Sequence, residues 1–357
     1  MDQLQFQDPI AELITNYNEL NSSVIEELDE EPSPLEFLRF VARNTPFVVR
    51  GAAADWQATR TWNVEFLKDV LRDEPVNVAV TPAGNADSPT PLTKPGFDNI
   101  NDGTTTNLVF AKPHEEDQPF ATFLDYLITQ EQKTASLSSQ PAKEAEEEGE
   151  SQGEVRYAQT QNDNLRHEYR PLFAHVQRTV PFARIALARD PDAINLWIGN
   201  SRSVTALHKD NYENIYVQIA GQKHFVLFPP VCQPCVNEKL LTTAHYERRS
   251  ARDDGGGRGG LELAVEEDAV AVPFAIWDPD RPGKNETRYS KLAEPMRVTL
   301  NAGDMLYLPC MWYHKVSQSC SPEGVCIAVN YWYDMDFSGP LYPLSTFVRS
   351  VSNTVGE

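Results

Sequence analysis

LHKDNYENIYVQIAGQKHFVLFPP, residues 207–230, contains the pattern that decides the fold. β-Branched and aromatic residues are frequent in 214–221 and 223–230, and the AGQK sequence between them is typical of a turn. Just before them, VTALHKD (204–210) has the composition of another short strand. Short strands in close succession, with a glycine turn and no helix between them, predict a sheet built from neighbouring segments.

Segments of the same kind occur on both sides of this stretch. We predict strands at 193–199, 296–304, 305–316 and 326–334, separated by turns such as NAGD. Many short strands with glycine turns and no intervening helices are typical of a double-sheet jelly roll or cupin-like barrel. The predicted fold class is therefore mainly β with helical decoration: a double-stranded β-helix of the cupin-like jelly-roll type, with N-terminal α/β elements and a C-terminal helix.

Apolar residues at helical spacing mark the regions outside this core. The pattern predicts helices at 9–30, from Pro34 onward, at 62–71 and at 119–129, and strands at 46–53 and 76–82. These elements, within residues 1–130, are expected to pack on the barrel, which is expected to extend over 155–338. A predicted final helix within 339–357 has one apolar face, made of Leu341, Leu344, Phe347, Val348 and Val351.

Two segments have a composition unsuited to a packed core. Residues 131–154 are poor in apolar residues and rich in Glu, Ser, Gln and Ala, which predicts a disordered acidic insert. Residues 247–261 are charged and glycine-rich, which predicts a flexible surface loop. Neither segment is expected to separate independent domains, because strands of the same pattern lie on both sides.

The formal net charge is −21, and much of it lies in short tracts. Residues 26–31 contain five acidic residues and residues 144–154 contain six, without any Lys or Arg. The remainder is only mildly acidic, which argues against a general nucleic-acid-binding surface. An acidic surface suits a basic peptide substrate, since acidic fields attract cationic partners, although solubility explains the charge equally well.

Other compositional features indicate where the protein works. No run of about eighteen apolar residues is present, so no membrane span is expected. The start of the chain has no secretory signal pattern, and the five cysteines do not suggest a disulfide framework. We therefore expect a location in the cytoplasm, with the nucleus as an alternative. Cys232 and Cys235 form a CQPC pair, which we interpret as two loop cysteines rather than a metal or redox motif.

The candidate metal-binding motif is His208-Lys209-Asp210. It lies at the end of a predicted strand, where residues i and i+2 point to the same face. An imidazole and a carboxylate there can occupy adjacent positions around one metal ion. His314 follows a glycine-aspartate turn and a strand in GDMLYLPCMWYH (303–314), and it can supply a third ligand from a distant strand.

Two histidines and one carboxylate leave open coordination positions, the arrangement of non-haem Fe(II) oxygenases. A structural zinc ion normally takes four protein ligands, so the incomplete set favours catalysis. Activation of dioxygen requires a two-electron donor, and 2-oxoglutarate is the common one. Lys223, at the start of the strand after the AGQ turn, is the candidate cation for its distal carboxylate. The alternative interpretations are a surface H-x-D pair with an unrelated histidine, and an ordinary strand-edge lysine.

The chain also resembles the Jumonji-C family of Fe(II)/2-oxoglutarate oxygenases. The resemblance rests on 207–230 and on GDMLYLPCMWYH, AVNYWYD (328–334), PLEFLRF (34–40), PFVVRGAA (46–53), VNVAVTP (76–82) and RYAQTQNDNL (156–165). It covers most of the chain except the two inserts and implies a double-stranded β-helix core. It also implies iron, 2-oxoglutarate and dioxygen as cofactors, with His208, Asp210 and His314 as iron ligands.

The same resemblance implies which residues hold the cosubstrate. Lys223 matches the lysine that binds the distal carboxylate of 2-oxoglutarate, Thr205 matches a threonine that shares this carboxylate, and Tyr157 matches a tyrosine that reaches the cosubstrate. Asn214 and Asn330 match polar residues that line the metal and cosubstrate pocket. A structural role stays open for the polar residues, since such side chains also satisfy buried backbone groups. Surface or packing roles are expected for the other histidines: His114, His167, His175, His224 and His245.

The function that the resemblance implies is hydroxylation of a lysine carbon in a protein, with developmentally regulated GTP-binding proteins as the expected partners. Histone lysine demethylation is the first alternative, and a metal-binding cupin scaffold without turnover is the second. The triad with Lys223 and Thr205 argues against a scaffold, which needs no cosubstrate site. The apolar final helix, and the dimers that related oxygenases form through terminal helices, lead us to expect a homodimer. No nucleic-acid or membrane partner is expected.

Overall fold

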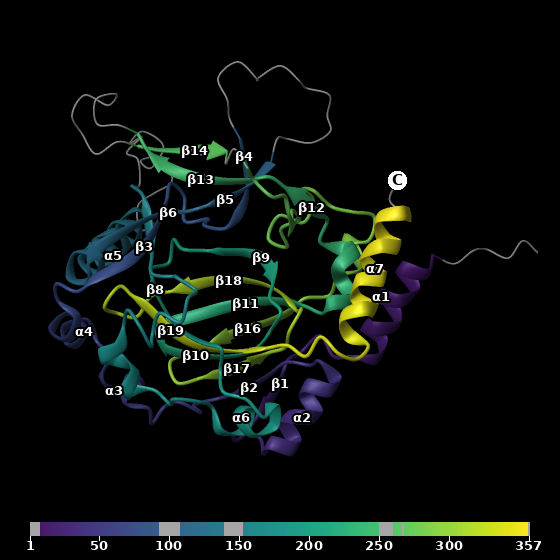
Figure 1. Ribbon diagram of the computed structural model, residues 1–357, viewed down its shortest axis with the longest axis horizontal. Helices are drawn as coiled ribbons and strands as arrows, with labels where there is room; N and C mark the ends of the chain where they lie inside the picture. Colours follow the sequence, from purple (N-terminus) through teal and green to yellow (C-terminus); the bar gives the residue numbers. More distant parts are fainter. Residues whose placement is uncertain (1–7, 93–107, 139–152, 250–259, 266–267, 356–357) are drawn as a thin grey trace, which may run out of the picture.

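The computed structural model describes residues 8–92, 108–138, 153–249, 260–265 and 268–355 (Figure 1). Two β-sheets form its centre. The larger has the strand order β1-β2-β17-β10-β19-β8, and the smaller has the order β16-β11-β18-β9. Neighbouring strands are antiparallel throughout both sheets, except that β1 runs parallel to β2.

The strands of the larger sheet are β1 (Glu26–Leu28), β2 (Phe47–Val49), β8 (Ala193–Gly199), β10 (Tyr212–Ala220), β17 (Met305–Leu308) and β19 (Cys326–Asp334). Those of the smaller sheet are β9 (Thr205–Lys209), β11 (Gln222–Phe228), β16 (Met296–Leu300) and β18 (Tyr313–Ser319). Large side chains of both sheets meet in one buried cluster that includes Trp197, Tyr216, Phe225 and Leu306. The mainly β, cupin-like jelly roll predicted from the sequence is confirmed.

Helices and a second buried cluster cover the other face of the larger sheet. In this cluster the rings of Phe37 and Tyr307 meet edge to face, with centroids 4.8 Å apart. Helix α2 begins where the sequence predicts, because Ser33 and Glu36 form a reciprocal capping box. The helices are α1 (Pro9–Leu20), α2 (Pro34–Arg43), α3 (Gln57–Thr61), α4 (Val64–Leu71), α5 (Phe120–Ser138), α6 (Pro181–Leu187) and α7 (Leu341–Val355), with 3-10 helices η1 (Arg170–His175), η2 (Pro230–Cys235) and η3 (Ser290–Leu292).

Further sheets pair strands from distant parts of the chain. They are β6-β3-β7 (His114–Pro119, Pro75–Thr81, Val155–Tyr157), β14-β13-β5-β4 (Leu261–Val265, Thr243–Arg248, Leu108–Lys112, Ser88–Pro91) and β12-β15 (Glu238–Leu241, Val272–Ala275). Strands β4 and β15 both contact β9, so these sheets lie over the β9 side of the barrel (Figure 1). They supply walls for the cavity described below.

The helix predicted over 9–30 is too long, because α1 ends at Leu20. Asn21 stops it: its side-chain amide donates to the Tyr17 carbonyl, 2.8 Å away, and its own backbone is extended. Residues 26–28, in the acidic tract, then form β1 beside β2. Tertiary pairing with β2 therefore overrides the helical pattern of the tract.

The disordered insert predicted over 131–154 is wrong at its start, because α5 continues to Ser138. Polar residues of this part have specific partners. Gln130 accepts a hydrogen bond from the Asn200 amide at 3.0 Å, and Glu131 accepts from the Ser201 hydroxyl at 2.7 Å. Residues 139–152 lie outside the described residues.

The loop predicted over 247–261 is shorter than expected, because strands occupy both of its ends. Strand β13 reaches Arg248 and pairs with β14, which begins at Leu261. Arg248 is anchored there by ion pairs with Glu116 and Glu154. Residues 250–259 lie outside the described residues.

The single strand predicted over 305–316 is also wrong, because this segment forms β17 and β18 in different sheets. Pro309 has no N–H to donate to a ladder, and Met311 adopts a φ of +66°, so the chain leaves the first sheet between them.

Part of the predicted apolar face of α7 is half-buried against the body of the protein. Val348 and Val351 pack against a cluster that contains Cys232 and Cys235, both fully buried in η2. A hydrogen bond with Cys235 and burial hold the pKa of the Cys232 thiol well above its usual value. Leu344 and Phe347, by contrast, are 60% and 64% exposed. Among the described residues, no helix has the length and apolar character needed to cross a membrane.

The AGQK turn gives a test of the fold. Gly221 has a φ of +71°, and a Cβ there would lie 2.6 Å from the Ser319 backbone oxygen. Gly221→Ala is expected to lower the free energy of unfolding by about 1–3 kcal/mol, measured by urea denaturation, because of left-handed strain and the close contact. Gly283→Ala is the matched control, since its Cβ would meet nothing within 4 Å. An equal loss in both variants would contradict the prediction.

Candidate metal centre

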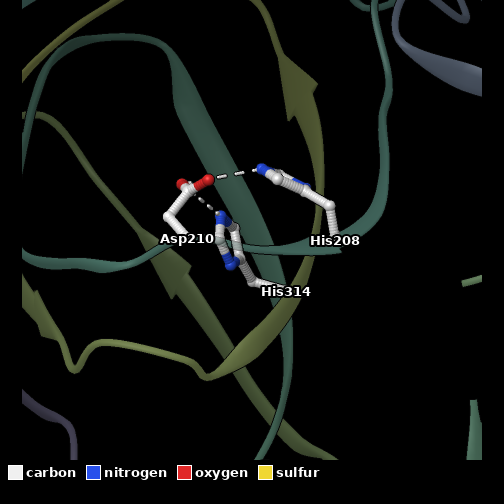
Figure 2. Close-up of side chains that lie close together, drawn as sticks. All are labelled: His208, Asp210 and His314. Atoms are coloured by element: carbon white, nitrogen blue, oxygen red, sulfur yellow. Dashed lines mark ion pairs between the residues drawn. The ribbon is translucent and has the colours of Figure 1, made fainter. Parts of the chain in front are cut away.

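The three sequence-predicted metal ligands meet at one end of the smaller sheet. His208 on β9 and His314 on β18 are directly paired across the antiparallel ladder. Asp210 follows β9 immediately, and its backbone carbonyl accepts a hydrogen bond from the Met311 N–H at 2.7 Å. Figure 2 shows the carboxylate turned toward both imidazoles. The strand pairing thus brings together residues that are about a hundred positions apart in the sequence.

The three side chains lie close enough together to hold one metal ion. Each histidine Nε2 lies 3.7 Å from the Asp210 Oδ2 atom, and the two imidazole centroids are 4.1 Å apart. The Nδ1 atom of His208 lies 2.8 Å from the Ala206 carbonyl, and that of His314 lies 3.0 Å from the Trp312 carbonyl. Since a carbonyl only accepts, each Nδ1 carries the proton and each Nε2 lone pair faces Asp210.

Electrostatics favour neutral imidazole at this site. Burial and the neighbouring His208 lower the pKa of His314 to about 4, while Asp210 opposes this shift. A neutral imidazole can donate its Nε2 lone pair to a cation without first losing a proton. Within the part of the chain that the structure describes, no fourth His, Cys, Asp or Glu joins the cluster. Three protein ligands with open positions suit a catalytic metal better than a structural one.

Lys223 lies on the face of the sheet that carries the histidines. It is four residues from Leu227, which pairs with His314, so both side chains of β11 point to the same side. Lys223 is only 3% exposed, and its ammonium donates to the Tyr157 hydroxyl at 2.8 Å. It forms no ion pair among the described residues. A buried ammonium with donors left over fits the carboxylate of a bound ligand.

Gly199 on β8 allows Tyr157 to reach Lys223. A Cβ at Gly199 would lie 2.7 Å from the Tyr157 ring and 2.6 Å from the Gln318 amide nitrogen. Any larger residue would therefore push the phenol away from the ammonium. The sequence predicts that Gly199 ends a strand, but no pattern in the sequence indicates that Tyr157 approaches it closely.

Of the other predicted cosubstrate residues, one lies in the cavity wall and two lie behind it. Thr205, at the start of β9, lines the cavity at His208 and Asp210, as does Trp197. Asn330 accepts from the Trp197 indole at 2.9 Å and donates to Asn214 at 3.1 Å, and both asparagines are buried. They support the cavity wall through Trp197, a residue that the sequence analysis did not single out.

The cavity that opens at His208 and Asp210 has a volume of about 990 Å³. Its lining comes from β5, β6, β8, β9, β12, β13, β15, β18, η2, α7 and the loops between them, so distant segments build it together. Asp87 and Gln159 line it and are hydrogen-bonded at 2.9 Å. The sequence analysis singled out neither: Asp87 lies outside the quoted motifs, and Gln159 lies in RYAQTQNDNL (156–165), of which only Tyr157 was assigned a role. His114 and His245, expected at the surface or in packing, also line this cavity.

Comparison with known proteins agrees with this geometry. The family model described as a cupin-like domain matches residues 33–339. The chain is 34% identical over 311 residues to the bifunctional peptidase and (3S)-lysyl hydroxylase JMJD7 of Homo sapiens, covering 87% of this chain and 84% of that protein. It is also 34% identical to lysine-specific demethylase JMJ32 of Arabidopsis thaliana (88% and 82% covered) and 29% identical to JmjC domain-containing protein E of Dictyostelium discoideum (91% and 92% covered).

Loss of one imidazole tests the site directly. His314→Ala leaves one imidazole and one carboxylate, so metal affinity should fall by more than the about 10–100-fold caused by losing a supporting hydrogen bond. Anaerobic calorimetry with Fe(II) measures the change. His224→Ala is the control, because that imidazole lies between the Thr299 and Ser319 hydroxyls. Unchanged Fe(II) affinity in His314→Ala would show that the cluster is not the metal site.

Proposed function

The chain belongs to the cupin-like family that includes Jumonji-C proteins, and on this premise we propose that it is an Fe(II)- and 2-oxoglutarate-dependent oxygenase that hydroxylates a protein lysine. The observation that carries the proposal is one barrel that holds both the His208–Asp210–His314 cluster and a buried Lys223. An oxygenase of this kind needs a metal site and a cation for its cosubstrate, whereas a metal-binding scaffold has no need of the cosubstrate cation.

The residues have separate tasks in this proposal. His208, Asp210 and His314 would hold the iron through two Nε2 atoms and a carboxylate oxygen. When bound, the iron supplies oxidation of a substrate C–H bond by dioxygen, with 2-oxoglutarate as the two-electron donor. Lys223 would neutralise the distal carboxylate of 2-oxoglutarate, with Thr205 as a further hydroxyl donor. Burial strengthens the Lys223 interaction, because little water competes with it.

Charges in the cavity support a cationic substrate side chain. Glu238 is already paired with Lys209 and Arg349. Asp87 and Glu115 also line the cavity, and neither forms an ion pair within the described residues. Burial raises the pKa of Asp87, although a hydrogen bond from Gln159 opposes this. Lys112 and His208 already attract the Asp87 carboxylate, and an incoming lysine ammonium that pairs with it directly would add to this attraction.

Lysine hydroxylation is the first candidate because the human relative is named as a (3S)-lysyl hydroxylase. We propose developmentally regulated GTP-binding proteins in the cytoplasm as its targets, on the basis of the resemblance described above. Demethylation of N-methyl-lysine, as in histones, is the second candidate, favoured by the equal identity to the Arabidopsis lysine-specific demethylase. The two reactions differ only in which carbon of the side chain is oxidised, since loss of an oxidised N-methyl group releases formaldehyde.

Mass spectrometry of substrate peptides distinguishes the candidates. The protein is incubated with Fe(II), 2-oxoglutarate, oxygen and lysine-containing peptides from developmentally regulated GTP-binding proteins, in parallel with methylated histone peptides. We expect one added oxygen on a lysine of the GTPase peptides and none with His208→Ala, which lacks a metal ligand. Lysine oxidation should be lost completely rather than slowed, because the oxidation depends on the metal.

Other outcomes of this experiment are equally informative. Loss of methyl groups from the histone peptides, with formaldehyde release, would replace hydroxylation by demethylation. No succinate from 2-oxoglutarate under any condition, with metal bound, would refute the oxygenase and favour the scaffold. His224→Ala serves as the unaffected control for histidine replacement.

We also propose that the protein forms a homodimer through α7. The observation behind this is the exposed apolar face of the helix, where Leu344 and Phe347 are more than half exposed. Light scattering is expected to give twice the chain mass of 40.2 kDa, and Phe347→Asp should return the monomer mass. Leu240→Asp, at a 72% exposed position outside α7, is the matched control and should remain dimeric. A monomer mass for the unmodified protein at micromolar concentration would contradict the proposal.

A further inference from the structure

The turn at residues 309–312, which joins β17 to β18, touches two of the three candidate metal ligands. The Met311 N–H donates to the Asp210 carbonyl at 2.7 Å. The Trp312 carbonyl lies 3.0 Å from Nδ1 of His314 and accepts its proton. The conformation of this turn therefore sets both the backbone position of Asp210 and the ring orientation of His314.

This turn is not held by a sheet ladder. Pro309 has no N–H, and Met311 has a φ of +66°, which is uncommon for a residue other than glycine. A backbone in such a conformation persists only when its surroundings determine it. The contacts that determine it must come from other elements.

Glu213 on β10 supplies one of these contacts. Its Oε2 atom accepts hydrogen bonds from the Cys310 N–H at 3.2 Å and from the Tyr307 hydroxyl at 2.7 Å. Asn44 supplies the others: its amide donates to the Cys310 carbonyl at 3.1 Å, and its oxygens accept from the Trp312 indole at 2.8 Å. Glu213 thus holds the backbone of the turn, and Asn44 holds both its backbone and the Trp312 indole.

Packing or charge pairing does not explain an acid at this position. Glu213 is 6% exposed and forms no ion pair with Lys, Arg or His in the described part of the chain. Burial raises the pKa of Glu213, while the bonds from Tyr307 and Cys310 oppose that shift. Burying an ionisable group without a counter-charge is unfavourable. The local interactions that Glu213 makes in return are the hydrogen bonds from Tyr307 and from the Cys310 N–H of the turn.

We propose that Glu213 is a positioning residue for the metal centre: it holds the turn 309–312, which in turn holds Asp210 and His314. This inference rests on the metal centre of the proposed function and assigns Glu213 no contact with metal or substrate. Its role is that of an acceptor, so an amide oxygen can replace the carboxylate oxygen. Loss of supporting hydrogen bonds of this kind typically weakens metal binding by about 10–100-fold.

Titration with Co(II), an iron surrogate with visible d–d absorption, tests the inference without any substrate. Glu213→Ala is expected to weaken Co(II) binding by about 10–100-fold and to change the shape of the d–d bands. Glu213→Gln should restore affinity and spectrum, because one amide oxygen can accept both bonds. Tyr333→Phe is the matched control: Tyr333 pairs with Glu213 across β10 and β19 and is buried, but its hydroxyl bonds with Val180. It should lower thermal stability and leave the Co(II) spectrum unchanged.

Clear results would overturn the inference. It fails if Glu213→Ala keeps the wild-type affinity and spectrum, or if Tyr333→Phe changes them as much. If Glu213→Ala does not fold, Tyr307→Phe replaces it, since this variant removes one bond to the carboxylate; an altered spectrum supports the inference and an unaltered one refutes it. A wild-type protein that does not bind Co(II) would instead refute the metal centre of the proposed function, and the inference with it.

Discussion

In the ladder between β9 and β18, His208 stands directly opposite His314, and the rest of the candidate centre depends on that register. Side chains alternate between the faces of a strand, so a slip by one residue would turn one imidazole away from the other. The same ladder places Asp210 just past the end of β9. Through the neighbouring ladder, in which Leu227 pairs with His314, it also places Lys223 on the face of the histidines. Backbone hydrogen bonds thus decide where the ligands lie.

Packing on both sides of the smaller sheet holds this register. Val316 of β18 packs with Phe225 inside the barrel, whereas Tyr313 of the same strand packs with Phe228 in a different cluster. A shifted strand would therefore lose apolar burial on two faces at once, at roughly 1.5–3 kcal/mol for each large side chain. Few other arrangements of this sequence can compete with the observed one. The apolar residues of these strands therefore fix the positions of the candidate metal ligands.

The ionisable groups at and near the centre lack the opposite-charge partners that buried charges usually have, which points to function. Lys223 is a cation whose described hydrogen-bond partners are the phenols of Tyr157 and Tyr216, and Glu213 is an acid without a basic partner among the described residues. Asp87 adds an unpaired carboxylate to the cavity wall. Each would be replaced at little cost by an apolar residue if only stability mattered. In the proposed function, their places would separate three tasks: Lys223 would bind the cosubstrate, Glu213 would position the ligands and Asp87 would recognise the substrate.

The sequence by itself determined the strands of the barrel and the H-x-D motif with its distant histidine. These depend on short-range patterns, because alternation and turn residues act within a few positions. Only the tertiary structure decided the rest. The hydrogen bond of Asn21 ends α1 earlier than predicted, and the turn at Met311 divides one predicted strand into two. Hydrogen bonds from Asn200 and Ser201 hold the polar end of α5, which is helical where disorder was predicted. Asp87, Trp197, Gly199 and Glu213 carry no local signal, because their roles come from partners that lie tens or hundreds of residues away and are set only when the sheets pair.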